Sequence, residues 1–367
     1  MITNPFENAF GLDISDLSMK VVQLQGKKRY LRTPSYKLKA ARSITLPYGL
    51  IVNGELEQPE MVRKYLMYLL EGNPKKNQKP INGPWVVASL PENRNFIKQI
   101  AIDKEPDDIV EEDILYLVKK HFPFEDNEYH LDWQLLPTPS RNKSVVLMGA
   151  APKHVADMYT YLLESVGLGI VGLDIESLAT ARSMITAEKE YVGEARAILD
   201  IGATKTIFIV YDNNSVKFSQ MIPFSGELIN TALTQKLKID FKKAEELKIQ
   251  YGCEFDSSKK EVWDVISGLI GTLVSEIEKA LRFYYSHFEN ANKINHITMC
   301  GGVTNMKKLP ELLSEKLGIE SEPGHVWKNL RVHNTKSLPS EKALSFATAI
   351  GLALRAADNP YTQKDSL

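Results

Sequence analysis

Segment 197–210 joins two apolar runs through a short polar turn, and it restricts the possible folds of this chain more than any other segment. The first run ends at Asp200, the turn holds Gly202 and Thr204, and apolar residues resume at Ile207. This pattern predicts a β-hairpin whose turn offers backbone N–H groups and hydroxyls to an anion. A carboxylate at a strand end can also hold a divalent cation, usually through water. An ordinary hairpin with glycine in its turn has the same pattern, so both interpretations stand.

Segment 10–24 has the same order of residues much earlier in the chain. An apolar strand ends at Asp13, a small polar turn follows, and an alternating strand resumes that carries Lys20. A lysine is a compact cation that suits phosphate oxygens. Two hairpins of this kind indicate a duplicated fold with a phosphate chain held between its halves.

A third segment, 297–303, predicts a strand that runs into Gly301 and Gly302, followed by a helix at 308–317. Glycine has no side chain that would block a flat ring, so these residues predict a ledge for such a ring. The most regular helical pattern lies at 262–288, where apolar residues recur at helical spacing.

In this order, the three segments resemble the first phosphate loop, the second phosphate loop and the adenosine loop of the actin-like ATPase superfamily. Segments 173–182, 275–284 and 347–355 are similar to the PilM family of type IV pilus assembly, whose nearest relative is the cell-division protein FtsA. The similarity extends from Phe10 to Arg355 and depends on the joint order and spacing of the motifs.

The resemblance implies an α/β fold of the duplicated actin-like (ribonuclease H-like) ATPase class, with two lobes around a nucleotide cleft and a small α+β insert. The first lobe would comprise residues 1–94, completed by 171–197 and 340–367, and the insert residues 95–170. The second lobe would comprise residues 198–339, with a smaller subdomain at 236–292.

The resemblance also implies ATP or ADP with Mg²⁺, and the metal would lie beside Asp13 and Asp200. The residues expected to contact the nucleotide are Gly11, Asp13, Ser15, Ser18, Lys20, Asp200, Gly202, Ala203, Thr204, Thr206, Gly226, Glu245, Lys248, Gly301, Gly302 and Val303.

Two of the candidate sites have a structural alternative. By resemblance, Glu176 belongs to a region that faces the terminal phosphate, so it could orient the attacking water as the catalytic residue. It could instead cap the helix that it begins. Glu245 and Lys248 match a superfamily pattern that contacts ribose or adenine. They also share one helix face, where a surface ion pair is common.

The first phosphate loop departs from the superfamily pattern. Relatives usually have Asp-Ile-Gly in both loops, whereas this chain has Asp13-Ile14-Ser15. A side chain crowds a turn where backbone meets phosphate, and it is costly if φ must be positive, although Ser15 could donate its hydroxyl instead. We therefore expect ATP binding with at most slow ATPase activity.

Acidic residues accumulate in the predicted insert. Between Asp103 and Asp132, eleven residues are acidic and three are basic. A helix is expected at 107–121, where acids in the first turn favour the helix dipole. The acidic run is either a solvated face or a docking face for a basic segment of a partner.

Composition excludes several classes of function. A net charge of −1 gives no electrostatic case for binding nucleic acid or an anionic membrane. The two isolated cysteines fit a reducing cytosol, the first residues lack a signal peptide, and no apolar run is long enough to span a membrane. The histidines lack metal-ligand spacing.

These features and the resemblance predict a cytoplasmic component of a type IV pilus or related type II secretion machine. Its partner would be the N-terminal cytoplasmic segment of a PilN-like inner-membrane protein, which would also bring it to the membrane, and nucleotide would act as a conformational switch. Self-association is a further expectation. The alternatives are an FtsA-like filament protein, whose C-terminal amphipathic helix has no counterpart after Arg355, and a small-molecule kinase, which would need a carboxylate base in a sugar pocket.

Overall fold

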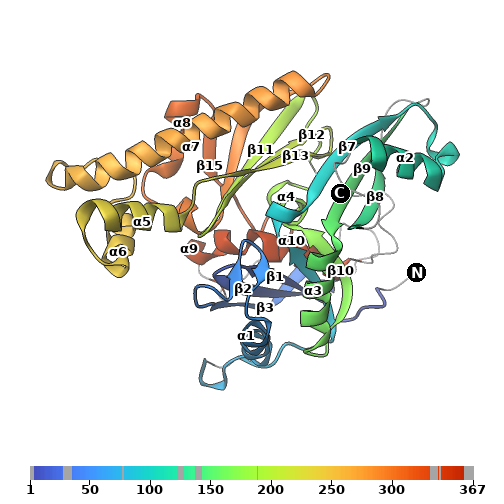
Figure 1. The fold of residues 1–367 in the computed structure, drawn as a ribbon, viewed down its shortest axis with the longest axis horizontal. Coiled ribbons are helices and arrows are strands. Elements are labelled where there is room, and N and C mark those ends of the chain that lie inside the picture. Colours follow the sequence, from blue (N-terminus) through green and yellow to red (C-terminus); the bar gives the residue numbers. More distant parts are fainter. Residues whose placement is uncertain are drawn as a thin grey trace. The chain divides into compact units, whose positions relative to one another are not determined.

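The computed structural model divides into two compact units (Figure 1). The first comprises Met1–Ala179 and Ala349–Leu367, and the second comprises Thr180–Thr348. The residues that the structure describes are 4–27, 35–76, 78–121, 128–136, 143–187, 189–330, 338 and 340–358.

The first unit contains a five-stranded sheet in the order β10-β6-β1-β2-β3. Its strands are β1 (Phe10–Ser15), β2 (Ser18–Lys27), β3 (Ser35–Thr45), β6 (Trp85–Leu90) and β10 (Gly169–Ile175). β1, β2 and β3 form an antiparallel meander, whereas β6 pairs with β1 and β10 in parallel. A short hairpin, β4 (Ile51–Val52) and β5 (Glu55–Leu56), precedes α1 (Pro59–Glu71).

Helices cover the sheet of the first unit through apolar contacts. α1 begins with proline at its first position, as helices often do. It packs with α3 (Lys153–Glu164) into one core that holds Leu66, Tyr159 and the β1 side chains Phe10 and Leu12. A second cluster joins the sheet to Leu352 of α10 (Ala347–Ala357).

The second unit repeats this topology, with its five strands in the order β13-β12-β11-β14-β15. Its strands are β11 (Glu194–Ile201), β12 (Thr206–Asp212), β13 (Ser215–Ile222), β14 (Lys293–Cys300) and β15 (Glu320–Pro323). Again an antiparallel meander is flanked by two parallel strands. The two predicted hairpins are therefore β1–β2 and β11–β12, and the predicted duplication of the fold is confirmed.

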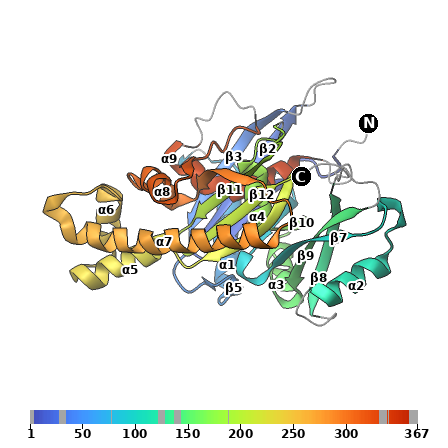
Figure 2. The ribbon, with the colours of Figure 1, turned by 90° about the horizontal axis from the view of Figure 1, so that it is seen from above.

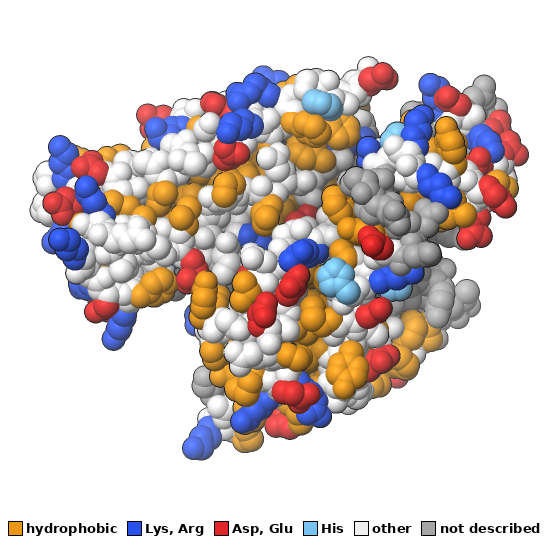
Figure 3. Space-filling model, viewed as in Figure 1, with side chains coloured by type: hydrophobic (Ala, Val, Ile, Leu, Met, Phe, Trp, Pro, Cys, Tyr) orange, Lys and Arg blue, Asp and Glu red, His pale blue; other side chains and the backbone are white. Residues whose placement is uncertain are grey.

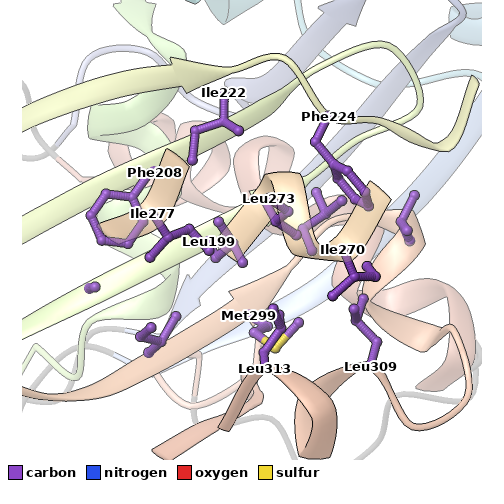
Figure 4. Close-up of a cluster of buried hydrophobic side chains, with 14 of the residues drawn as sticks. Leu199, Phe208, Ile222, Phe224, Ile270, Leu273, Ile277, Met299, Leu309 and Leu313 are labelled. Carbon is purple, nitrogen blue, oxygen red and sulfur yellow. The ribbon is translucent and has the colours of Figure 1, made fainter. Parts of the chain in front are cut away.

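A large hydrophobic core lies between the second sheet and the long helix α7 (Lys260–His287) (Figure 4). Ile270, Leu273 and Ile277 of α7 are fully buried with Leu199 and Phe208 of the sheet. α7 corresponds to the helix expected at 262–288. The other helices of this unit are α4 (Glu176–Met184), shared with the first unit, α5 (Gly226–Leu237), α6 (Phe241–Tyr251), α8 (Leu309–Leu317) and α9 (Ser340–Ala343).

Within the first unit, three antiparallel strands and a helix form a small layer of their own (Figure 2). The strands are β7 (Phe96–Ile102), β8 (Tyr129–Leu136) and β9 (Ser144–Pro152), in the order β7-β9-β8, and the helix is α2 (Glu111–His121). Ile100, Val118 and Met148 form its core. α3 follows directly, but its buried side chains belong to the core of the first unit.

The start of α2 differs from the expectation of a helix from residue 107. Pro106–Asp108 forms a separate 3-10 turn, and Ile109 is extended. The Asp113 carboxylate accepts a hydrogen bond from the backbone N–H of Val110 at 3.1 Å and pairs with Lys104 at 2.7 Å. Part of the acidic run, residues 122–127, lies outside the described residues.

None of the helices in the described ranges is both long enough and apolar enough to cross a membrane.

Candidate nucleotide site

Asp13 is held at the end of β1 by polar groups of the first unit. It is only 4% exposed, and it lies opposite Lys20 in the β1–β2 register. The Lys20 ammonium lies 3.1 Å from Asp13 Oδ2 and donates to Ser18 Oγ at 2.9 Å. A buried carboxylate requires this kind of compensation, because desolvation of an unpaired charge is costly.

Two serines complete the surroundings of Asp13. Ser15 donates its hydroxyl to Asp13 Oδ1 at 3.2 Å, and its φ is not positive, so the expected backbone strain is absent. Ser89, at the end of β6, is fully buried, lies 3.4 Å from Asp13 Oδ1 and accepts the backbone N–H of Ile14 at 3.0 Å. Ser89 was not among the predicted residues. Its only signal in the sequence is that it is a polar residue in an otherwise apolar strand.

Gly11 serves packing within the first unit. A Cβ atom there would lie 2.3 Å from the backbone nitrogen of Ala353 in α10. Only glycine permits this approach of helix to strand. The described contact of Gly11 is with the chain's own helix, and its contact with nucleotide stays a prediction.

Glu176 is buried at the first position of α4. The next amide, that of Ser177, donates to Glu92 Oε2 at 3.0 Å, so Glu92 supplies a capping bond to this helix. Burial raises the pKa of the Tyr159 hydroxyl, and the nearby charges of Glu176, Asp16 and Asp13 raise this pKa further. The Tyr159 hydroxyl therefore stays protonated.

In the second unit, Asp200 lies beside Ile207 and Cys300 in the sheet register. Burial raises the pKa of the Cys300 thiol well above its usual value, and the adjacent Asp200 carboxylate raises it further by its charge and by a hydrogen bond. Gly301 has φ +84°, and a Cβ atom there would lie 2.5 Å from Asp200 Oδ1. The second carboxylate is thus packed directly against the first of the paired glycines.

The turn after Asp200 is tied to the start of α5. Gly202 donates its N–H to the carbonyl of Lys205 at 2.9 Å, which closes the turn. The N–H groups of Gly226 and Glu227 donate to the carbonyls of Gly202 and Ala203 at 3.1 and 2.8 Å.

The two threonines of this hairpin differ in exposure. Thr204 is half-buried. Thr206 is fully buried and donates its hydroxyl to the Phe224 carbonyl at 2.7 Å. A fully buried hydroxyl with this partner is suited to fixing the turn.

Residues predicted from four separate segments meet around Gly226. A Cβ atom at Gly226 would lie 3.1 Å from Val303, 3.4 Å from the Lys248 ammonium and 3.7 Å from Ala203. Lys248 is buried and pairs with Glu245 at 2.5 Å. The pair is therefore more than a surface contact of one helix.

Asn230 was not among the predicted residues. It donates to Glu245 Oε2 at 2.5 Å. A helix asparagine carries no distinct sequence signal, and only its proximity to Glu245 reveals it. Gly302, in contrast, is exposed, and a Cβ atom there would meet no other side chain or backbone segment within 4 Å. Its face is therefore open to a flat ring.

The structure describes Asp13 in the first unit and Asp200 in the second. Within the described residues there is no group of three or more His, Cys, Asp or Glu side chains that could hold a metal ion.

The two sheets of identical topology, each with an Asp-ended hairpin, define an actin-like ATPase fold. A model of the type IV pilus assembly protein PilM family matches residues 11–357, and the chain belongs to this family. The predicted family and fold class are confirmed.

Solved structures agree with this assignment. The chain is 25% identical to a chain of a PilM-PilN type IV pilus biogenesis complex, with a TM-score of 0.79 over 96% of this chain and 100% of that one. It is 14% identical to the ethanolamine utilization protein EutJ of Carboxydothermus hydrogenoformans, with a TM-score of 0.54 over 94% and 88% of the two chains. The latter likeness shows the fold alone.

Cell-division proteins are more distant relatives. The chain is 24% identical to FtsA of Buchnera aphidicola over 215 residues, which are 52% of this chain and 50% of that protein. It is 24% identical to FtsA of Neisseria meningitidis over 215 residues, 52% and 49% of the two. The match thus spans about half the length of these relatives.

Proposed function

We propose that this chain is the cytoplasmic PilM-type component of a type IV pilus or related type II secretion assembly machine. It binds the N-terminal cytoplasmic segment of a PilN-like inner-membrane protein and reaches the membrane through it. The observation that carries this proposal is the likeness to the PilM-PilN complex over nearly the whole of both chains.

We further propose that the chain binds ATP or ADP with Mg²⁺. The donor set fits this group: Glu245 can accept ribose hydroxyls, Lys248 and Lys20 are cations, and Gly302 leaves room for a ring. Asp13 and Asp200 would hold the metal, with water and phosphate oxygens as its other ligands. Bound Mg²⁺ would supply charge neutralisation for the phosphates.

Individual residues take different roles in this proposal. Ser15, Ser18, Lys20, Gly202, Ala203 and Thr204 contact phosphate, whereas Gly301, Gly302 and Val303 support the adenosine. Gly11 and Thr206 act as positioning residues, because their described contacts are with Ala353 and Phe224. Gly226 keeps the space beside Lys248 clear, and Glu176 orients the attacking water.

The insert is the proposed contact for the partner peptide. Acidic and basic side chains mix on the surface around α2 (Figure 3), and Val110, Leu115 and Tyr116 are exposed apolar residues there. A cytoplasmic leader beside a bacterial membrane span tends to be basic. Acidic residues would therefore raise the association rate, while apolar contacts and backbone hydrogen bonds supply affinity.

Calorimetric titration of a PilN-like N-terminal peptide tests the partner assignment. The comparison variant replaces residues 97–150 with a short Gly-Ser linker, which spares α3 because its side chains build the core of the first unit. We expect affinity to fall at least about tenfold, about 1.4 kcal/mol. Equal binding by both proteins would place the peptide elsewhere, and the acidic run would be a solvated face.

Titration of Mg-ATP into Asp200→Ala tests the nucleotide assignment. The variant should bind at least about tenfold more weakly, since phosphate charge in a protein site requires compensation. Asp157→Ala is the control, because Asp157 is exposed and its carboxylate pairs with His130 at the surface. If Asp200→Ala binds Mg-ATP as tightly as the wild type, Asp200 does not hold the metal.

A further inference from the structure

The turn formed by Asn53 and Gly54, between β4 and β5, contacts segments that are far apart in the sequence. Both residues have positive φ, 50° and 78°, and Gly54 is buried. Figure 2 shows β5 beside α3. The contacts of this 53–54 turn reach the first phosphate loop, the entry to the insert and the helix that follows the insert.

On one side, the 53–54 turn is tied to the first phosphate loop. Asp16 lies at the tip of the β1–β2 hairpin, which the Ser15–Ser18 pair closes. Its Oδ1 accepts the backbone N–H of Gly54 at 3.0 Å, and its Oδ2 accepts that of Asn53 at 3.3 Å. A carboxylate that accepts two N–H groups is a strong link, so a movement of the hairpin tip displaces the turn.

On the other side, the turn is tied to residues 91–95, the hinge that leads from β6 into β7 and hence into the insert. The side-chain amide of Asn93 donates to the Asn53 carbonyl at 2.7 Å. A Cβ atom at Gly54 would lie 2.3 Å from the Cβ of Pro91. The turn and the hinge therefore touch without room for a methyl group.

The same hinge and turn also hold the segments that follow the insert. Glu92, in the hinge, caps α4 through the Ser177 amide at 3.0 Å. Tyr159 of α3 donates its hydroxyl to the Gly54 carbonyl at 3.1 Å. Entry to the insert and return from it are thus anchored at one point, next to the proposed catalytic Glu176.

Unsatisfied polar atoms concentrate at this point. Among the described residues, seven buried side-chain polar atoms have no hydrogen-bond partner, and four of them are Asn93 Oδ1, Arg94 Nε, Asn95 Oδ1 and Ser177 Oγ. Such atoms raise the free energy of the arrangement that buries them. A rearrangement of the hinge that gives these atoms hydrogen-bond partners would recover part of that free energy.

We propose that the 53–54 turn transmits the state of the first phosphate loop to the hinge of the insert, so that nucleotide and partner peptide alter each other's affinity. This inference rests on the proposed function. By linkage, the two affinities change by the same factor, whichever ligand is added first.

Gly54→Ala is the most direct test, because the added methyl group separates the turn from Pro91. Gly49→Ala is its matched control, because Gly49 also has a positive φ, +83°, but a Cβ atom there would meet no other segment within 4 Å. Peptide affinity is measured with and without Mg-ATP. In the wild type it should change at least about fivefold, a change that Gly49→Ala retains and Gly54→Ala abolishes.

Hydrogen exchange of the full chain tests the link without any ligand. In Asp16→Ala, the amides of the hinge and of Ser177 should exchange at least about tenfold faster than in the wild type, because local opening sets their exchange rate. Asp16→Ala also tests the link if Gly54→Ala does not fold. Unchanged exchange at Ser177 would overturn the link.

The outcomes separate this inference from the proposed function. If both ligands bind and neither changes the affinity of the other, the inference is wrong and the function stands. If Gly54→Ala keeps the wild-type change in affinity, the turn is not the link. If Mg-ATP does not bind while exchange at Ser177 responds to Asp16→Ala, the proposed nucleotide role fails and the mechanical link stands.

Discussion

Two glycines with positive φ differ in what surrounds them. Gly301 has φ +84° and packs against the Asp200 carboxylate, whereas Gly318 has φ +63° and open space where a Cβ would lie. Alanine costs about 1–2 kcal/mol at Gly318, whose φ of 63° and ψ of 22° are left-handed. It costs more at Gly301, where ψ is 165° and the added Cβ would lie 2.3 Å from the carbonyl oxygen of Ile201. Only at Gly301 does the methyl group also reach a proposed metal ligand.

Gly301→Ala should therefore lose Mg-ATP affinity by at least about tenfold and lose more stability, whereas Gly318→Ala should keep the affinity. Calorimetric titration measures the affinity and urea denaturation measures the stability. Equal affinities of the two variants would show that the position of Asp200 does not matter for nucleotide.

A buried thiol gives the stability of the fold an alkaline limit. Burial, with a smaller effect from Glu311, raises the pKa of Cys253 from 9.0 to about 12. Between these values the unfolded chain releases a proton that the folded chain keeps. Stability is therefore fully present below pH 9.0 and declines as the pH rises toward 12.

Urea denaturation at several pH values above 9.0 should show this decline, to which Cys253 contributes up to about 1.4 kcal/mol per pH unit. Cys253→Ala loses packing at every pH, so its curve should be lower near neutrality but less steep above pH 9.0. Parallel curves for the two proteins would contradict the raised pKa.

At the scale of elements, helix starts depend on partners from elsewhere in the chain. α5 and α6 begin with their own caps, Ser225 and Asp240, whose side chains accept backbone N–H groups. The described cap of α4 comes instead from Glu92, 85 residues earlier. The start of α4, which carries Glu176, thus depends on the hinge of the insert.

Glu92→Ala should lower the free energy of unfolding by about 1–2 kcal/mol, because a buried capping carboxylate and its favourable interaction with the helix dipole are lost. Glu92→Gln keeps an acceptor oxygen and should lose less than half as much. Urea denaturation of the two variants measures both losses. An equal loss in the two variants would contradict the capping role of Glu92.

At the scale of the molecule, each unit builds its own sheet and core. In the first unit, Asp13 is already paired with Lys20 and accepts the Ser15 hydroxyl. A carboxylate engaged in this way is less available to a metal. Hydrolysis should therefore be slow, as in a switch rather than a metabolic enzyme. Self-association remains a prediction.

Phosphate release by the purified full-length protein should run far below the median enzyme rate of about 10 per second. Ser15→Gly removes one bond to Asp13 and restores the superfamily pattern, so it should raise the rate severalfold. A wild-type rate near the median would contradict the switch proposal, and no effect of Ser15→Gly would show that this serine does not limit turnover.

Local patterns of the sequence were sufficient for the two hairpins, for α7 and for the duplicated fold, because strand alternation, polar turns and helical spacing involve residues close in the chain. The family resemblance named Ala203, Gly226, Lys248 and Val303 as nucleotide contacts, and the structure brings these four residues together. Their contact with nucleotide stays a prediction.

Other features were decided only by tertiary structure, because they depend on contacts between distant segments, which no local spacing encodes. Glu92 caps α4 across 85 residues, and Ser89 reaches Asp13 across 76. Gly11 also permits the close approach of α10 to β1. α3 has an ordinary helical pattern, yet only packing assigns its buried face to the core of the first unit.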